Sequence, residues 1–217
     1  MIVTNPRLTA INAELGIPAE FLAARGLSEC TEAPCLVVAE IGGDGREHLL
    51  APSAAIAWRE LKAAAIGEGI SLFIVSAFRS IDRQTEIFRR KLETGVPIED
   101  ILSICAVPGF SEHHTGHAID LSTPGSRSLE VEFDRTSAFV WLRVHAAEFG
   151  YHLSYPLGNR SGYQYEPWHW CFHDAQSILP SGATRSNYLA LAGSNVDSHV
   201  SLAKEPSNES ATRNNRA

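Results

Sequence analysis

Histidine and carboxylate side chains are concentrated in two short segments of this 217-residue sequence. The first is SEHHTGHAIDLS (111–122), and the second is YQYEPWHWCF (163–172). Imidazole and carboxylate groups are good Zn²⁺ ligands, and a catalytic zinc site uses three protein ligands and keeps its fourth position open. His113, Asp120 and His169 would meet this requirement. Glu166 would supply a further carboxylate three residues before His169.

The spacing within the first segment leaves two ligand pairs open. His113 and Asp120 suit a loop ligand followed by a strand ligand, since Gly116 allows the chain to turn between them. His113 and His117 would form the pair if the segment were a helix. Gly116 and the strand-like run AIDL (118–121) favour the first arrangement. Any one histidine alone, such as His114, is more often a hydrogen-bonded core or surface residue.

On these residues the sequence resembles a known family, the zinc D-alanyl-D-alanine carboxypeptidases and dipeptidases. That family includes vancomycin-resistance enzymes, and its superfamily also holds endolysin peptidases and hedgehog-type domains. Its motif S-x-H-x-x-G-x-A-x-D is matched by Ser111, His113, Gly116, Ala118 and Asp120, and its motif E-x-W-H by Glu166, Trp168 and His169. A third signature, a serine–aromatic–arginine–serine turn followed by glutamine, is present as SAFRSIDRQ (76–84). The three matches occur in the family order, and joint matches are far more specific than one motif.

The resemblance implies one Zn²⁺ per chain, held by His113, Asp120 and His169. It further implies that Glu166 is the general base, that Arg79 faces the substrate carbonyl, and that Gln84 and Ser111 bind substrate. A zinc-activated water with a nearby carboxylate base is sound chemistry for peptide hydrolysis. The alternatives are an ordinary surface ion pair for Arg79 and a solvated helix residue for Gln84.

The implied function is removal of D-alanine from peptidoglycan stem peptides, so the expected partner is a peptidoglycan-derived peptide. An endolysin-type endopeptidase is the main alternative, because both activities use the same zinc site. A catalytically silent zinc-binding module is the other alternative. Glu166 argues against this alternative, because a zinc-binding module without catalytic activity would be expected to have lost the general base.

The elements that must position these residues indicate an α+β fold. Apolar spacing predicts helices over 53–66, from Ser80 to Gly95, and over 137–149. We expect a small, mainly antiparallel sheet with strands near 72–78, 117–122, 151–155 and 168–172, the last within a strand-like run over 163–172, and a further strand or hairpin near 35–45. Glu166 and His169 would face opposite sides of a regular strand, so we expect a bend or bulge at Pro167.

Composition limits the remaining possibilities. The net charge of −7 and the pI near 5.7 argue against a nucleic-acid partner. No apolar run is long enough for a membrane span, and the first 25 residues lack a signal-peptide pattern, so the sequence as written predicts a cytoplasmic protein, although the resembled family is often extracytoplasmic. Cytoplasmic action on precursors, release by lysis and an incomplete N-terminus stay open as alternatives. We expect a peptidase domain over 1–180 and a disordered polar tail over 181–217, with one docked helical turn over 188–191 as the alternative within the tail. The sequence leaves the oligomeric state open.

The four cysteines are too few for a disulfide scaffold. Cys30 and Cys35 are interpreted as free thiols, with a local disulfide as the alternative. Cys171 would share a strand face with His169, which would bring its thiol near the metal. A packed, neutral cysteine is the favoured interpretation.

Overall fold

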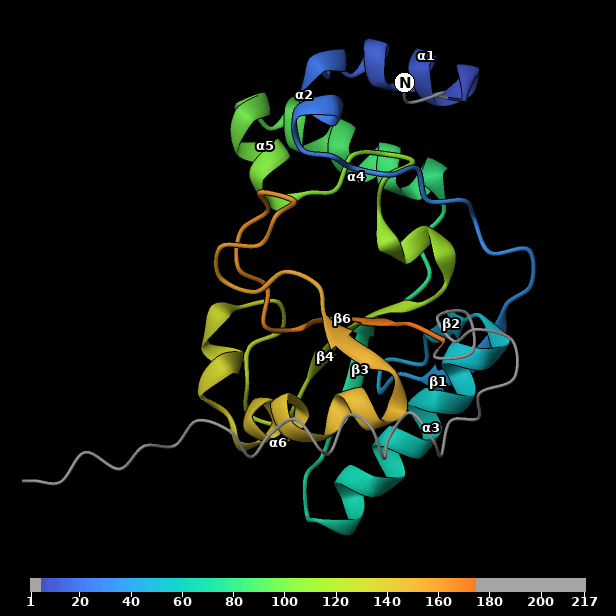
Figure 1. Cartoon of the computed structure of the whole chain (residues 1–217), viewed down its shortest axis with the longest axis vertical. Helices are drawn as coiled ribbons and strands as arrows, with labels where there is room; N and C mark the ends of the chain where they lie inside the picture. The colour runs from blue at the N-terminus through green and yellow to red at the C-terminus, as the bar shows by residue number, and fades with distance from the viewer. Residues whose placement is uncertain (1–4, 175–217) are drawn as a thin grey trace, which may run out of the picture. The chain divides into compact units, whose positions relative to one another are not determined.

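The computed structural model describes residues 5–174, which form an α+β fold (Figure 1). The predicted tail, its helical turn and the predicted boundary at residue 180 lie outside these residues. The helices are α1 (Pro6–Glu14), α2 (Ala19–Ala24), α3 (Pro52–Gly67), α4 (Ile81–Glu93), α5 (Ile98–Ile104) and α6 (Ser137–His145), with 3₁₀ turns η1 (Glu112–Thr115), η2 (Val131–Arg135) and η3 (Ala146–Phe149). The strands are β1 (Val37–Ile41), β2 (Glu47–Leu50), β3 (Phe73–Ser76), β4 (Ala118–Ser122), β5 (Tyr151–Leu153) and β6 (His169–Phe172).

The main sheet has four strands in the order β3-β4-β6-β5, and every neighbouring pair is antiparallel. These are the four strands that the sequence predicted, so the α+β prediction is confirmed. β1 and β2 form a separate hairpin, as expected for the segment near 35–45. None of the helices in residues 5–174 is long and apolar enough to cross a membrane.

The main core lies between the four-stranded sheet and helices α3 and α6. Trp58 and Leu61 of α3 are buried there with Ile119 of β4 and Leu142 of α6. The Tyr151 hydroxyl, at the start of β5, donates a hydrogen bond of 2.8 Å to a carbonyl of α3. This core fixes the sheet that carries the candidate ligands.

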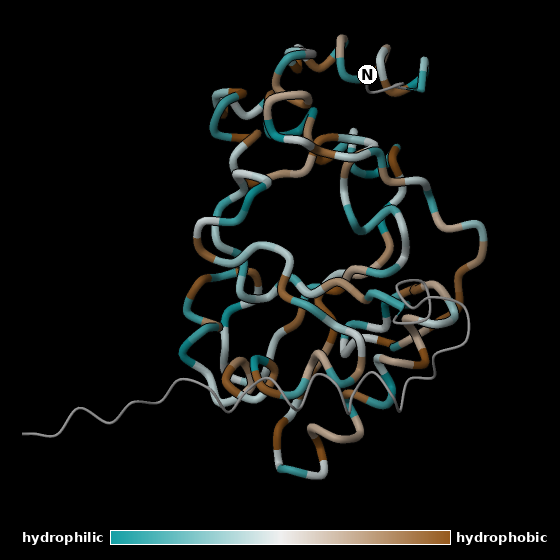
Figure 2. Tube along the Cα trace, in the orientation of Figure 1, coloured by the Kyte–Doolittle hydropathy of each residue, from teal (hydrophilic) through white to brown (hydrophobic). Residues whose placement is uncertain are grey.

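A second apolar cluster joins α4 and α5 to the N-terminal helices. Its buried members include Phe88 of α4, Ile101 of α5 and Leu22 of α2. Figure 2 shows hydrophobic residues both around the sheet and among these helices. The sequence did not reveal α1, α2 and α5, because they have only 6 to 9 residues and offer few turns for helical periodicity.

Two predicted elements differ from the structure in extent. The strand-like run over 163–172 is a strand only from His169, because the chain turns at Pro167 before it enters the sheet. The helix predicted over 137–149 is α-helical to His145 and continues as the 3₁₀ turn η3. α4 begins as expected, since the Ser80 hydroxyl accepts a hydrogen bond of 3.0 Å from the Arg83 amide.

Candidate metal centre and active site

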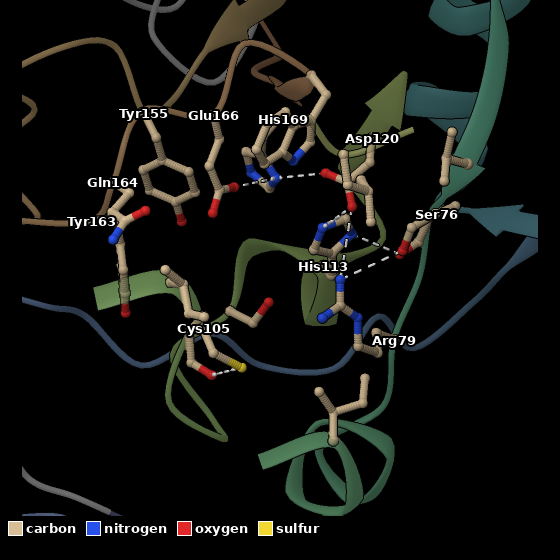
Figure 3. A pocket seen from close by; sticks show the side chains of 18 of the residues that line it. Ser76, Arg79, Cys105, His113, Asp120, Tyr155, Tyr163, Gln164, Glu166 and His169 are labelled. Carbon is tan, nitrogen blue, oxygen red and sulfur yellow. Dashed lines mark hydrogen bonds and ion pairs between the residues drawn. The ribbon is translucent and has the colours of Figure 1, made fainter. Parts of the chain in front are cut away.

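His113, Asp120 and His169 come together from three elements of the fold. His113 lies in η1, while Asp120 and His169 are Cα partners on the adjacent strands β4 and β6. His113 Nε2 is 3.2 Å from Asp120 Oδ2, and His169 Nδ1 is 3.0 Å from Asp120 Oδ1 (Figure 3). One ligand atom from each residue lies within 4.8 Å of the others, and all three side chains are buried.

The other nitrogen of each histidine has a hydrogen-bond acceptor. His113 Nδ1 is 2.7 Å from the Ala77 carbonyl oxygen, so this nitrogen carries the proton and Nε2 keeps its lone pair. His169 Nε2 is 2.9 Å from a carboxylate oxygen of Glu112, which leaves Nδ1 toward Asp120. Histidines that bind metals are usually oriented by such acceptors. Glu112 was absent from the sequence-based candidates.

The charges around this cluster are strongly coupled. Burial opposes ionisation of Asp120, but the neighbouring histidines outweigh it and hold the pKa of this carboxyl well below its usual range. Burial would lower the pKa of His169, but hydrogen bonds to Asp120 and Glu112 raise it to about 10. The carboxylates of Asp120 and Glu112 thus favour a positive charge at the position between them. A bound dication would take over that role, because metal ligands must be deprotonated.

The turn at Pro167 places Glu166 beside the candidate ligands. The amide of His169 donates to the Glu166 carbonyl at 3.1 Å, and the Glu166 amide donates to the Tyr155 carbonyl at 3.1 Å. This turn brings the Glu166 carboxylate to 4.0 Å from His169 Nδ1, although the two residues are three apart in sequence. Burial raises the pKa of Glu166 to about 7. A group with that pKa is suited to accept and return a proton near neutral pH.

Arg79 follows β3 and faces the same cluster (Figure 3). Its guanidinium donates to Gln84 Oε1 at 2.8 Å and to the Ser76 hydroxyl at 3.4 Å. A guanidinium nitrogen lies 3.8 Å from Asp120 Oδ2, and the side chain is only 20% exposed. Arg79 is therefore a held cation at the site and not an ordinary surface ion pair.

Gln84 is fully buried, so the alternative interpretation of Gln84 as a solvated helix residue is wrong. Its amide oxygen accepts from Arg79, and its amide nitrogen donates to the Ala106 carbonyl at 2.6 Å and contacts the Cys105 sulfur at 3.2 Å. Gln84 is also not among the residues that line the cavity at the site. Gln84 thus lies behind Arg79, and its substrate role stays a prediction.

Ser111 lies where the motif predicted, just before η1. It is 2% exposed and lines the cavity, so its substrate role stays a prediction. The extra histidines do not join the ligands. His114 is buried, with Nδ1 2.6 Å from the Arg79 carbonyl and Nε2 accepting from the Gly109 amide at 3.1 Å. His117 packs instead against Phe172, with ring centroids 5.8 Å apart.

The cysteines behave as thiols in the described part of the chain. Cys30 and Cys35 are both free, so the local disulfide is not present. Cys171 is buried, and burial with the nearby Glu112 charge raises the pKa of its thiol far above the ordinary value. The favoured interpretation of Cys171, a packed neutral cysteine, agrees with this environment.

A cavity of about 820 Å³ opens over the cluster. Its lining includes the three candidate ligands together with Arg79 and Glu166. Two nitrogens and a carboxylate that converge in a buried site, each imidazole oriented by an acceptor, fit the donor set of catalytic Zn²⁺. The α+β fold thus carries a candidate site of the kind that metal-dependent hydrolases use, with an open cavity beside the three possible ligands.

Comparison with known proteins identifies the family within this class. Residues 47–175 match the model of the VanY family, described as D-alanyl-D-alanine carboxypeptidase. The matched region covers more than half of the chain and contains every candidate site residue. The chain belongs to the VanY family of D-alanyl-D-alanine carboxypeptidases.

Individual relatives agree with this assignment. The putative carboxypeptidase YodJ of Bacillus subtilis (strain 168) is 33% identical over 127 residues, which cover 57% of this chain and 46% of that protein. The chain thus spans about half of the length of this relative. The LdcB LD-carboxypeptidase is similar in structure, with a TM-score of 0.60, 30% identity, and coverage of 73% of this chain and 78% of that one.

A zinc complex is among the similar structures. The vancomycin-resistance D,D-pentapeptidase VanY from a VanB-type cassette, in complex with Zn(II), has a TM-score of 0.51 and 26% identity. The similarity covers 71% of this chain and 89% of that one.

Proposed function

We propose that this protein is a zinc-dependent carboxypeptidase that removes D-alanine from the stem peptides of peptidoglycan. One observation carries the proposal: three buried ligand groups, a carboxylate with a raised pKa and a held arginine line one cavity. His113, Asp120 and His169 would hold the metal. The VanY family assignment supports the reaction class and the terminal D-alanine.

Each remaining group has a separate task. When bound, zinc supplies a Lewis acid that polarises a carbonyl and acidifies water. Glu166 accepts the proton of the attacking water and returns it to the departing amine, a role that its place in the cavity beside the three possible ligands supports. Arg79 donates to the oxygen that gains negative charge, and Gln84 and Ser76 hold its guanidinium for that purpose.

One cationic side chain of the cavity supports a substrate with a free carboxyl terminus. Lys91 lines the cavity, and a cationic side chain is suited to a terminal carboxylate, whereas Arg83 in the same lining is paired with Glu86 at 2.8 Å. An endopeptidase acts within a peptide and has no need of such a group. This argument supports exopeptidase action over the endolysin-type alternative.

Mass spectrometry of the products tests the proposal. Zinc-loaded protein is incubated with a stem pentapeptide ending in D-alanyl-D-alanine, with the tetrapeptide, and with a C-terminally amidated pentapeptide. We expect loss of one alanine from the free pentapeptide alone, and no product after zinc is removed by a chelator. Shortening of the tetrapeptide alone would indicate LD-carboxypeptidase action, cleavage of the amidated peptide would indicate an endopeptidase, and intact substrates would contradict the proposal.

A further inference from the structure

Glu112 connects the metal centre to the end of β5. Its Oε2 atom accepts from His169 Nε2 at 2.9 Å and from the Ser154 hydroxyl at 2.6 Å. Ser154 directly follows β5, whereas Glu112 opens η1. A single carboxylate oxygen therefore joins three segments that meet beside the site.

The hydrogen bond between Glu112 and His169 bears on the tautomer and the orientation of the His169 ring. A neutral imidazole that offers Nδ1 to a metal must carry its proton on Nε2, and an acceptor at Nε2 fixes both this tautomer and the ring orientation. The acceptor here is an anionic carboxylate, which also makes the other nitrogen a stronger donor to a metal. Glu112 precedes His113 in η1, so one turn supplies a ligand and orients a second ligand.

Two other roles for Glu112 fit the geometry less well. An ordinary surface ion pair is exposed on both sides, whereas the side chains of His169 and Glu112 are only 4% and 29% exposed. A fourth ligand would have to face the point where the three ligand atoms meet. Glu112 instead faces the opposite nitrogen of His169.

We propose that Glu112 is a positioning residue of the metal centre, which holds His169 with Nδ1 toward the metal, and that Ser154 in turn holds Glu112. The inference rests on the proposed zinc site. Loss of an acceptor of this kind typically weakens metal binding by about 10- to 100-fold. Glu112→Ala should show that loss, and Glu112→Gln should lie between it and wild type, because the amide oxygen accepts a hydrogen bond but lacks the charge.

Zinc affinity is the measurement that tests this role. Metal-depleted full-length protein is titrated with zinc in competition with a chromophoric chelator, and the Co²⁺ form is followed by its visible spectrum. We expect wild type to bind one zinc, Glu112→Ala to bind one zinc about 10- to 100-fold more weakly with an altered Co²⁺ spectrum, and Ser154→Ala to show a smaller loss. Glu99→Gln, which removes an exposed charge on α5, should leave affinity and spectrum unchanged.

The possible outcomes separate the inference from the proposed function. Wild-type affinity in both Glu112 variants would overturn the positioning role, and so would complete loss of zinc, which would make Glu112 a ligand. A wild-type protein without zinc would instead overturn the proposed function, and the inference with it. Thermal unfolding of each metal-depleted variant checks the fold, and Glu112→Gln carries the test if Glu112→Ala does not fold.

Discussion

Asp120 and His169 face each other as partners on β4 and β6, with Oδ1 of one 3.0 Å from Nδ1 of the other. Side chains alternate along a strand, so a register shift of one residue would turn one of the two groups to the opposite face of the sheet. The site therefore depends on the register of the central strand pair. If zinc binds only when β4 and β6 pair in this register, its binding would also stabilise the fold.

Asp120→Ala should abolish stoichiometric zinc binding, because it removes the group that lies between both histidines. His117→Ala should retain one zinc per chain, since His117 packs on Phe172 away from the ligands. Metal analysis of the purified, dialysed proteins checks both. Full zinc in Asp120→Ala together with none in His117→Ala would reverse the ligand assignment.

Gly116→Ala should destabilise the protein more than Gly158→Ala. Both glycines have positive φ, +68° and +70°, so both substitutions add backbone strain of about 1–2 kcal/mol. At Gly116 a Cβ atom would also lie 2.9 Å from the Ala51 amide nitrogen, whereas nothing lies within 4 Å at Gly158. We expect an additional cost of about 1–3 kcal/mol at Gly116, measured by urea unfolding. Equal costs would mean that the loop has room to move.

Arg79→Ala should lower kcat by about 10²- to 10³-fold while zinc is retained, because it removes a donor to the developing oxyanion. Gln84→Ala should give a smaller loss in kcat, since Gln84 acts on the reaction through Arg79. Arg89→Ala, which removes an exposed ion pair with Glu14, is the control and should change neither kcat nor zinc content. If Gln84→Ala raised KM without changing kcat, Gln84 would be a substrate-binding residue and not a positioning residue.

Glu166→Gln should stabilise the metal-depleted protein at alkaline pH. Burial raises the pKa of Glu166 from 4.5 to about 7, so the folded state binds this proton more tightly than the unfolded state. The ionised carboxylate therefore costs stability, fully above about pH 7 and not at all below about pH 4.5. We expect a gain of about 1–3 kcal/mol at pH 8 that declines as the pH falls through this window. Urea unfolding at several pH values measures it, and a pH-independent difference would contradict the explanation.

The central sheet was predictable because local signals agree with the tertiary structure, and the family motifs indicated which three side chains the fold brings together. The strand-like run before Arg79, the Ser80 cap and Gly116 each have a short-range cause that the sequence displays. The turn at Pro167 followed from the spacing of Glu166 and His169. α1 was missed even though Asn5 caps it and Pro6 begins it, because so short a helix depends on tertiary packing.

The groups that orient the ligands and Arg79 were not predictable. Glu112 occupies a variable position of its motif, and only the fold brings it to His169, 57 residues away. The Ala77 carbonyl that orients His113 is part of the backbone and leaves no mark in the sequence. The hydrogen bond from Arg79 to the Gln84 amide oxygen likewise depends on side-chain packing that the motif does not display.

The account depends most directly on Glu166 as the base beside a zinc centre. Turnover of a stem pentapeptide by zinc-loaded Glu166→Gln, compared with wild type at equal zinc content, tests this most simply. We predict one zinc per chain in both proteins and a rate lower by about 10²- to 10⁴-fold in the variant, because the amide keeps the shape but cannot accept the proton. Near wild-type turnover by the zinc-loaded variant would contradict the account.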